Sequence, residues 1–169
     1  GGNFESLQID PAAASTSVTD DVDATTVSLS ATASVAEGGS IVYTATLSNA
    51  AQTPVTVTLS SGEAIIIAAG ATTGSVTIGA PSDDVHVDAG SVSRTIASAS
   101  GGNFEALTVN PAAATTTVTD TIDTTTVSIT GDAVVAEGAT AAYVISLTSP
   151  AQTAVTVNLT YSGVAADGA

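Results

Sequence analysis

The chain has 169 residues, of which 16 are acidic, one is arginine and one is histidine, and the formal net charge is −15. This charge argues against nucleic acid and anionic membrane surfaces as partners, because both require basic residues. Cysteine is absent, which excludes disulfides and thiolate metal sites, and no apolar run reaches the ~20 residues of a membrane span. Apolar residues make up 44% of the chain but aromatic residues only 3%, which favours several slim domains over one broad core.

An internal repeat is the strongest signal in the sequence. GGNFESLQIDP at 1–11 returns as GGNFEALTVNP at 101–111, so the offset is 100 residues. A unit of this length has the size of one immunoglobulin-like β-sandwich. We therefore expect residues 21–120 to form a complete repeat. Residues 1–20 are expected to be the C-terminal strands of a preceding repeat, and residues 121–169 the first three strands of a following, truncated one.

Alternation of apolar residues with threonine and serine predicts strands throughout the repeat. Glycine, proline, asparagine and aspartate separate the alternating runs, as turns require. In chain order, the expected strands are 25–31, 40–48, 55–60, 64–68, 75–79, 91–99 and 107–119. No segment has an amphipathic 3.6-residue period over the length of a helix. The expected fold is therefore all-β, with tandem immunoglobulin-like antiparallel β-sandwich domains of about seven strands each.

Acidic residues gather at one end of the expected sandwich, where the loops 35–39 and 82–90 lie beside the exit of the last strand. The carboxylates of this end are Glu37, Asp83, Asp84, Asp88, Asp120 and Asp123. Converging carboxylates repel one another unless a cation lies among them, and Ca²⁺ takes six to eight hard oxygen ligands. The sequence therefore predicts a Ca²⁺ site at the junction with the next repeat. The alternative is that these acids only mark solvated loops.

The same reasoning applies to the preceding junction, where the corresponding acids are Asp20, Asp21 and Asp23. An enzyme is not expected, because without cysteine the usual nucleophile–base pairs have a single candidate base, His86. The aromatic residues that line a sugar cleft are also nearly absent. We interpret His86 as an exposed loop residue or one that touches the acidic cluster, with a transition-metal ligand as the alternative.

The motifs GGNFEALTVNPAAATTTVTDTIDTTTVS, VAEG and SPAQTAVTVNLTYSGVAADG resemble the extender repeats of giant LapA-like biofilm adhesins. The resemblance covers essentially the whole chain. It implies type I secretion and retention outside the cell, at the bacterial outer surface. It also implies a long array of immunoglobulin-like domains, stiffened by Ca²⁺ at the domain junctions, a role that by position falls on the six junction acids named above.

The resulting function is that of a structural spacer in a cell-surface adhesin. Its partners would be the neighbouring repeats of the same chain, without nucleic acid and without membrane insertion. The surface or glycan ligand would be bound elsewhere in the parent protein. The alternative is that each repeat itself binds a glycan or a surface as a weak, multivalent binding module.

Overall fold

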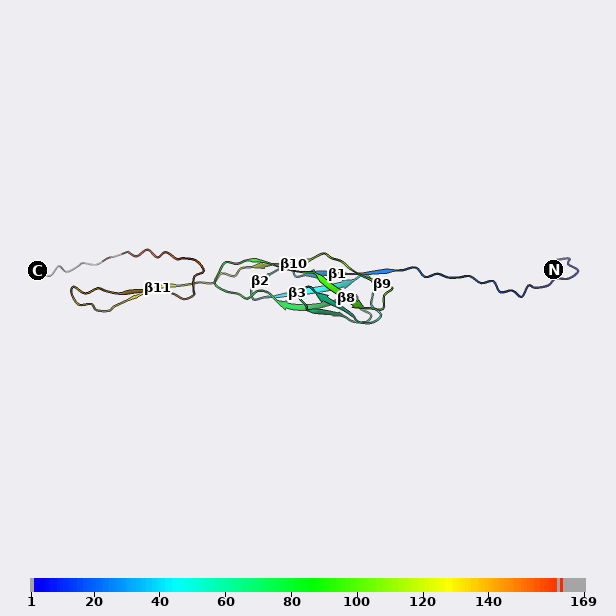
Figure 1. Ribbon diagram of the computed structural model, residues 1–169, viewed down its shortest axis with the longest axis horizontal. Helices are drawn as coiled ribbons and strands as arrows, with labels where there is room; N and C mark the ends of the chain where they lie inside the picture. Colours follow the sequence, from blue (N-terminus) through cyan, green and yellow to red (C-terminus); the bar gives the residue numbers. More distant parts are fainter. Residues whose placement is uncertain (1, 161, 163–169) are drawn as a thin grey trace.

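The computed structural model describes residues 2–160 and 162, and in that part of the chain it is all-β, without a helix. Ten strands follow one another between residues 24 and 119, and two more lie between 127 and 147 (Figure 1). The strands are β1 (Ala24–Ala31), β2 (Ser34–Ala36), β3 (Ser40–Leu47), β4 (Val55–Leu59), β5 (Ala64–Ile67), β6 (Thr73–Gly79), β7 (Gly90–Arg94), β8 (Ile96–Gly101), β9 (Ala106–Val109), β10 (Ala114–Thr119), β11 (Val127–Gly131) and β12 (Tyr143–Leu147). Among the described residues, no helix could cross a membrane.

Strands β1 to β10 form three sheets that share one core. One sheet has the order β6-β3-β1-β9, and the other two have the orders β5-β4-β8 and β2-β10-β7. Only Thr95 separates β7 from β8, so the chain passes directly from one three-stranded sheet into the other. Buried apolar residues from all three sheets belong to a single cluster.

The core follows the alternation of the sequence. In β3, the residues Ile41, Tyr43, Ala45 and Leu47 are buried while Val42 on the other face is exposed. Strands β4 and β5 add further valine and isoleucine side chains from the opposite side. Because few aromatic residues are present, branched aliphatic side chains provide most of the buried area, each contributing about 1.5–3 kcal/mol.

Two expected strands are each divided, and the expectation of continuous strands was wrong there. The run 107–119 breaks at Pro111, which has no N–H to donate to a neighbouring strand, and the side chain of Asn110 accepts the N–H of Ala112 (3.0 Å). Strand β9 pairs in parallel with β1, whereas β10 pairs antiparallel with β7 and in parallel with β2. The run 91–99 breaks at Thr95, whose N–H donates to Oγ of Ser60 (3.2 Å).

The segments on either side of β1–β10 differ in structure. Residues 2–23 form no strand, although strand structure was expected in 1–20. Strands β9 and β10, which stand 100 positions later, are paired with β1, β2 and β7, and no described residue pairs with 2–23 in this way. Strands β11 and β12, in contrast, pair in the register of β1 and β3, with Val127 opposite Leu147 as Val27 is opposite Leu47. The division into repeats stays a prediction from the sequence.

Candidate metal centre

Three segments that are distant in the sequence meet at the end of the strand bundle where β10 leaves it. The first is the turn between β2 and β3, which contains Glu37 and continues through Gly38 in a left-handed conformation (φ 67°). The N–H of Glu37 donates to the carbonyl of Thr119 at the end of β10 (3.0 Å). The N–H of Gly38 donates to the carbonyl of Pro81 in the β6–β7 loop (2.7 Å). Backbone hydrogen bonds thus tie the turn to both neighbouring segments.

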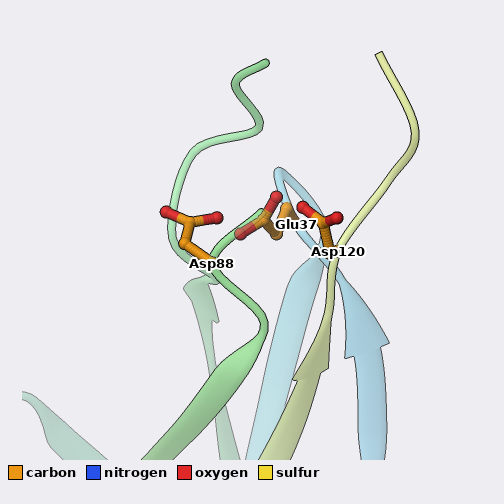
Figure 2. Close-up of side chains that lie close together, drawn as sticks. All are labelled: Glu37, Asp88 and Asp120. Atoms are coloured by element: carbon orange, nitrogen blue, oxygen red, sulfur yellow. The ribbon is translucent and has the colours of Figure 1, made fainter. Parts of the chain in front are cut away.

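Each of the three segments supplies one carboxylate to a common cluster. The ligand atoms of Glu37, Asp88 and Asp120 all lie within 4.8 Å of one another. Figure 2 shows the three side chains at the ends of the strands, with Glu37 in the middle. Asp88 comes from the β6–β7 loop, and Asp120 directly follows β10. Two oxygen ligands of one Ca²⁺, each about 2.4 Å from the ion, are at most about 4.8 Å apart, so the three groups are close enough to share one ion.

The burial of Glu37 distinguishes this cluster from a group of solvated acids. Glu37 is only 7% exposed, and its Oε2 is buried without a hydrogen-bond partner. Oδ1 of the half-buried Asp120 is also buried without a partner. A buried carboxylate oxygen without a partner is unfavourable, because it has lost its hydration without gaining a hydrogen bond. A cation between these oxygens would supply the missing interaction, so the residues fit a metal ion.

The electrostatic environment of Glu37 reflects the same crowding. The pKa of Glu37 is raised from 4.5 to about 7, first by a hydrogen bond with the carboxyl group of Asp88 that favours the protonated form. Burial raises the pKa further, and so do the negative charges of Asp88, Asp120 and Asp83. A cation among these carboxylates would oppose this shift, because a positive charge favours the ionised form of Glu37.

Not all of the predicted ligands enter the cluster. The side chain of Asp83 accepts a hydrogen bond from the hydroxyl of Thr121, the residue that follows Asp120. Asp84 accepts the backbone N–H of His86 (2.7 Å) within its own loop. Asp123 is exposed and does not belong to the three-carboxylate group. Of the six predicted acids, the structure thus brings Glu37, Asp88 and Asp120 together. Asp83 lies beside the cluster and acts on it through its charge, and Asp84 and Asp123 stand outside the group.

The acids predicted for the preceding junction do not form a second cluster among the described residues. Asp20 and Asp21 are exposed in the segment without strands. The backbone N–H of Asp23 donates to Oε2 of Glu105 (2.6 Å), which fixes the start of β1 against the β8–β9 turn. The sequence analysis did not single out Glu105. The repetition of GGNFE at 1–5 and 101–105 was the signal that could have identified it. Thr121, which holds Asp83, had no comparable signal.

A family model described as the LapA domain matches residues 23–121, which is more than half of the chain and includes the whole three-carboxylate cluster. No curated protein and no solved structure matches the chain significantly. LapA domains are adhesin-type domains of cell-surface proteins involved in biofilms, and they are not a known enzyme family. The chain therefore belongs to the LapA domain family.

Proposed function

We propose that residues 21–120 are an immunoglobulin-like extender repeat of a bacterial surface adhesin, and that Ca²⁺ bound by Glu37, Asp88 and Asp120 stiffens its junction with the following repeat. The observation that carries the proposal is the buried Oε2 of Glu37, which has no hydrogen-bond partner and belongs to a carboxylate within ligand distance of two others. Three carboxylates supply between three and six oxygens, and backbone carbonyls or water would complete the coordination of Ca²⁺.

The position of the cluster explains how an ion would act on the junction. Glu37 and Asp88 belong to loops of the strand bundle, whereas Asp120 is the first residue beyond β10. An ion held by all three would fasten the exit of the chain to the body of the repeat. The hydrogen bond from Thr121 to Asp83 fastens the next residue to the same loop. Bending at residues 120–123 would then be restricted while the ion is bound.

The remaining parts of the proposal rest on the family and on the repeat. An array of near-identical units is quasi-one-dimensional, because each unit touches only its neighbours, and this suits a spacer between the cell and a distant adhesive region. Type I secretion to the bacterial outer surface follows from the resemblance to LapA-like adhesins. The formal charge of −15 would keep such a long extracellular chain soluble.

The test compares the chain in Ca²⁺ with the chain in chelator, at equal ionic strength and with Mg²⁺ as the control cation. We expect Ca²⁺ to raise the melting temperature and to increase the longest dimension measured by small-angle X-ray scattering. Coincident melting and scattering curves in the two conditions would reject the role of Ca²⁺.

A further inference from the structure

The segment that contains β11 and β12 exposes apolar residues whose counterparts in the first repeat are buried. Tyr143 is 59% exposed, whereas Tyr43, which stands 100 positions earlier, is 1% exposed. Because β11 and β12 pair in the register of β1 and β3, this side of the sheet is an open core face in the described part of the chain. We call it the acceptor face, and it consists of Val127, Tyr143, Ile145, Val155, Val157 and Leu159.

In the first repeat, the segment 102–120 supplies part of the cover for this core. Strand β9 pairs in parallel with the start of β1, with Val109 opposite Val27. Strand β10 lies against β1 and pairs with β2, with Val118 opposite Val35. Alternate side chains of β10 are buried, namely Ala114, Thr116 and Val118. The two strands thus close one side of the core that begins at β1.

A second, unpaired version of the covering segment is present at residues 2–20. This segment repeats 102–120 nearly unchanged, and it forms no strand. Ile9 stands at the position of Val109, and Val18 at the position of Val118. Ile9 is 89% exposed and Val18 is 90% exposed. The same chain therefore carries an open core face and an unused segment of the kind that covers such a face.

The segment 2–20 cannot cover the acceptor face of its own chain. In Figure 1 it extends from one end of the strand bundle, while β11 lies beyond the other end. The chain from Val18 to Ala24 spans at most about 22 Å, whereas the eight residues of β1 alone extend over about 26 Å. The residues that correspond to β2, 134–136, lie farther away still, beyond the link at 120–123. Only a second copy of the chain can bring the two surfaces together.

We propose that residues 6–19 of one copy cover the acceptor face of a second copy by strand exchange. Residues 6–9 then pair with 124–127 of the second copy, as β9 pairs with β1. Residues 17–19 pair with 134–136, as β10 pairs with β2. Each copy has its donor segment and its acceptor face at opposite ends, so the contact is heterologous and does not close. The product is a head-to-tail row of copies.

A polar contact of the first repeat can form again in the exchanged position. Oε2 of Glu105 accepts the N–H of Asp23 (2.6 Å), where the covering segment meets the start of β1. Glu5 and Asp123 stand at the equivalent positions of the donor segment and of the acceptor. Both are exposed in the single chain. Exchange therefore adds a specific hydrogen bond to the apolar contact, and this bond favours one register.

Sedimentation velocity of the full chain, at rising protein concentration and in chelator, tests the exchange. We expect species larger than a dimer, because every row keeps a free donor segment at one end and a free acceptor face at the other. A chain that stays monomeric at the highest soluble concentration would overturn the proposal. A dimer that grows no further would also overturn it, because two acceptor faces packed against each other form a closed contact.

The result can be separated from that of the Ca²⁺ proposal. Strand exchange rests on the repeat, as the proposed function does, but it requires no Ca²⁺. Head-to-tail association in a chain without a melting response to Ca²⁺ would support the exchange and reject the metal site. A melting response in a chain that stays monomeric would do the opposite.

Matched variants identify the donor segment. Val18→Asp should weaken association at least about a hundredfold, because an unpaired charge is strongly disfavoured in the exchanged core. Val22→Asp is the control, because it adds the same charge outside residues 6–19 and should associate like wild type. Val18 is 90% exposed and Val22 71% exposed in the single chain, so neither variant should unfold β1–β10. Equal association of the two variants would overturn the proposal.

A mixture of two variants tests donor and acceptor together. Ile145→Asp disrupts the acceptor face, as Val18→Asp disrupts the donor segment. Each variant alone should stay monomeric, whereas an equal mixture should form a dimer and nothing larger, because one intact donor meets one intact acceptor. This result does not require β11 and β12 to remain folded in the Ile145→Asp chain, which supplies only the donor. A mixture that stays monomeric would overturn the exchange.

Discussion

The substitution Glu37→Gln tests the metal centre most directly, because it removes a charge while keeping the shape of the buried side chain. Extracellular Ca²⁺ modules bind with Kd of about 10⁻⁴–10⁻³ M. At about 10 mM Ca²⁺, binding to the native state alone would stabilise the wild-type repeat by about 1.4–2.7 kcal/mol. For a domain of this size, that corresponds to an increase in Tm of about 6–20 °C.

The expected effect of the variant follows from the charge that it removes. Even in the dielectric of water, a divalent ion about 2.4 Å from a carboxylate oxygen attracts it by about 3.5 kcal/mol. The amide oxygen of glutamine compensates in part, so we expect Ca²⁺ affinity to fall by at least about tenfold. At about 10 mM Ca²⁺ the increase in Tm should then drop to about half of the wild-type value or less. In chelator the variant should be at least as stable as wild type, because it lacks the repulsion from Asp88, Asp120 and Asp83.

The assay is thermal unfolding followed by circular dichroism, in Ca²⁺ and in chelator. Asp84→Asn is the matched control, because it removes one charge from the same end of the repeat but affects a carboxylate bonded only to the N–H of His86. This control should keep the full response to Ca²⁺. A Glu37→Gln protein with the wild-type increase in Tm would refute the assignment of the site.

Three further predictions concern the same repeat. In chelator, the stability of wild type relative to Glu37→Gln should fall as the pH rises from about 4.5 to about 7 and then level off. In this window the folded state keeps the proton of Glu37, whereas the unfolded state has released it. A difference in Tm that stays flat across this range would contradict the raised pKa of Glu37. In chemical denaturation, Tyr43→Phe should leave stability unchanged or increase it by up to about 1–3 kcal/mol, because the Tyr43 hydroxyl is buried without a hydrogen-bond partner. Tyr143→Phe, at an exposed site, is the control and should have no effect. Gly101→Ala should lower the stability of the protein more than Gly62→Ala in the same measurement. Both glycines have a positive φ, but only at Gly101 would a Cβ lie 2.3 Å from a backbone oxygen, that of Pro54. Equal losses of stability would show that this close approach does not matter.

The alternation of apolar and polar residues predicted most of the strands, because it shows which face of a strand is buried. Burial dominates the energy of a sheet. The alternation at Ile41, Tyr43 and Ala45 therefore placed β3 correctly. The break at Pro111 could have been predicted from the sequence, because proline has no N–H. The break at Thr95 was not, because it depends on Ser60, a residue from a different strand connection.

Nearly identical segments in two surroundings show what the local sequence pattern cannot decide. Val18 and Val118 occupy the same place in the repeat, yet Val18 is 90% exposed and Val118 only 3%. Val118 lies in β10, which pairs with β7 and β2, while Val18 has no such neighbours. Strand structure in this segment is therefore set by pairing partners and not by the intrinsic preference of its residues.

The candidate site was predictable in outline for the same reason. Topology brought the three acidic segments together, and Glu37, Asp88 and Asp120 meet there. The sequence could not distinguish them from Asp83 and Asp84, because a short loop side chain can turn to a local donor instead, as Asp84 does toward the N–H of His86.

The two parallel strand pairs, each of which joins an early strand to a late one, have a mechanical consequence. Strand β1 is paired with β9 over Ala24–Val27 and Ala106–Val109, and β2 is paired with β10 in the same sense. Tension applied at the two ends of the repeat pulls such strands along their length in opposite directions. The hydrogen bonds between them are then loaded together in shear, whereas a hairpin pulled from its open end breaks its bonds one after another. A repeat connected in this way should resist flow-induced stretching for longer than its thermodynamic stability alone suggests, because forced unfolding is governed by the unfolding rate.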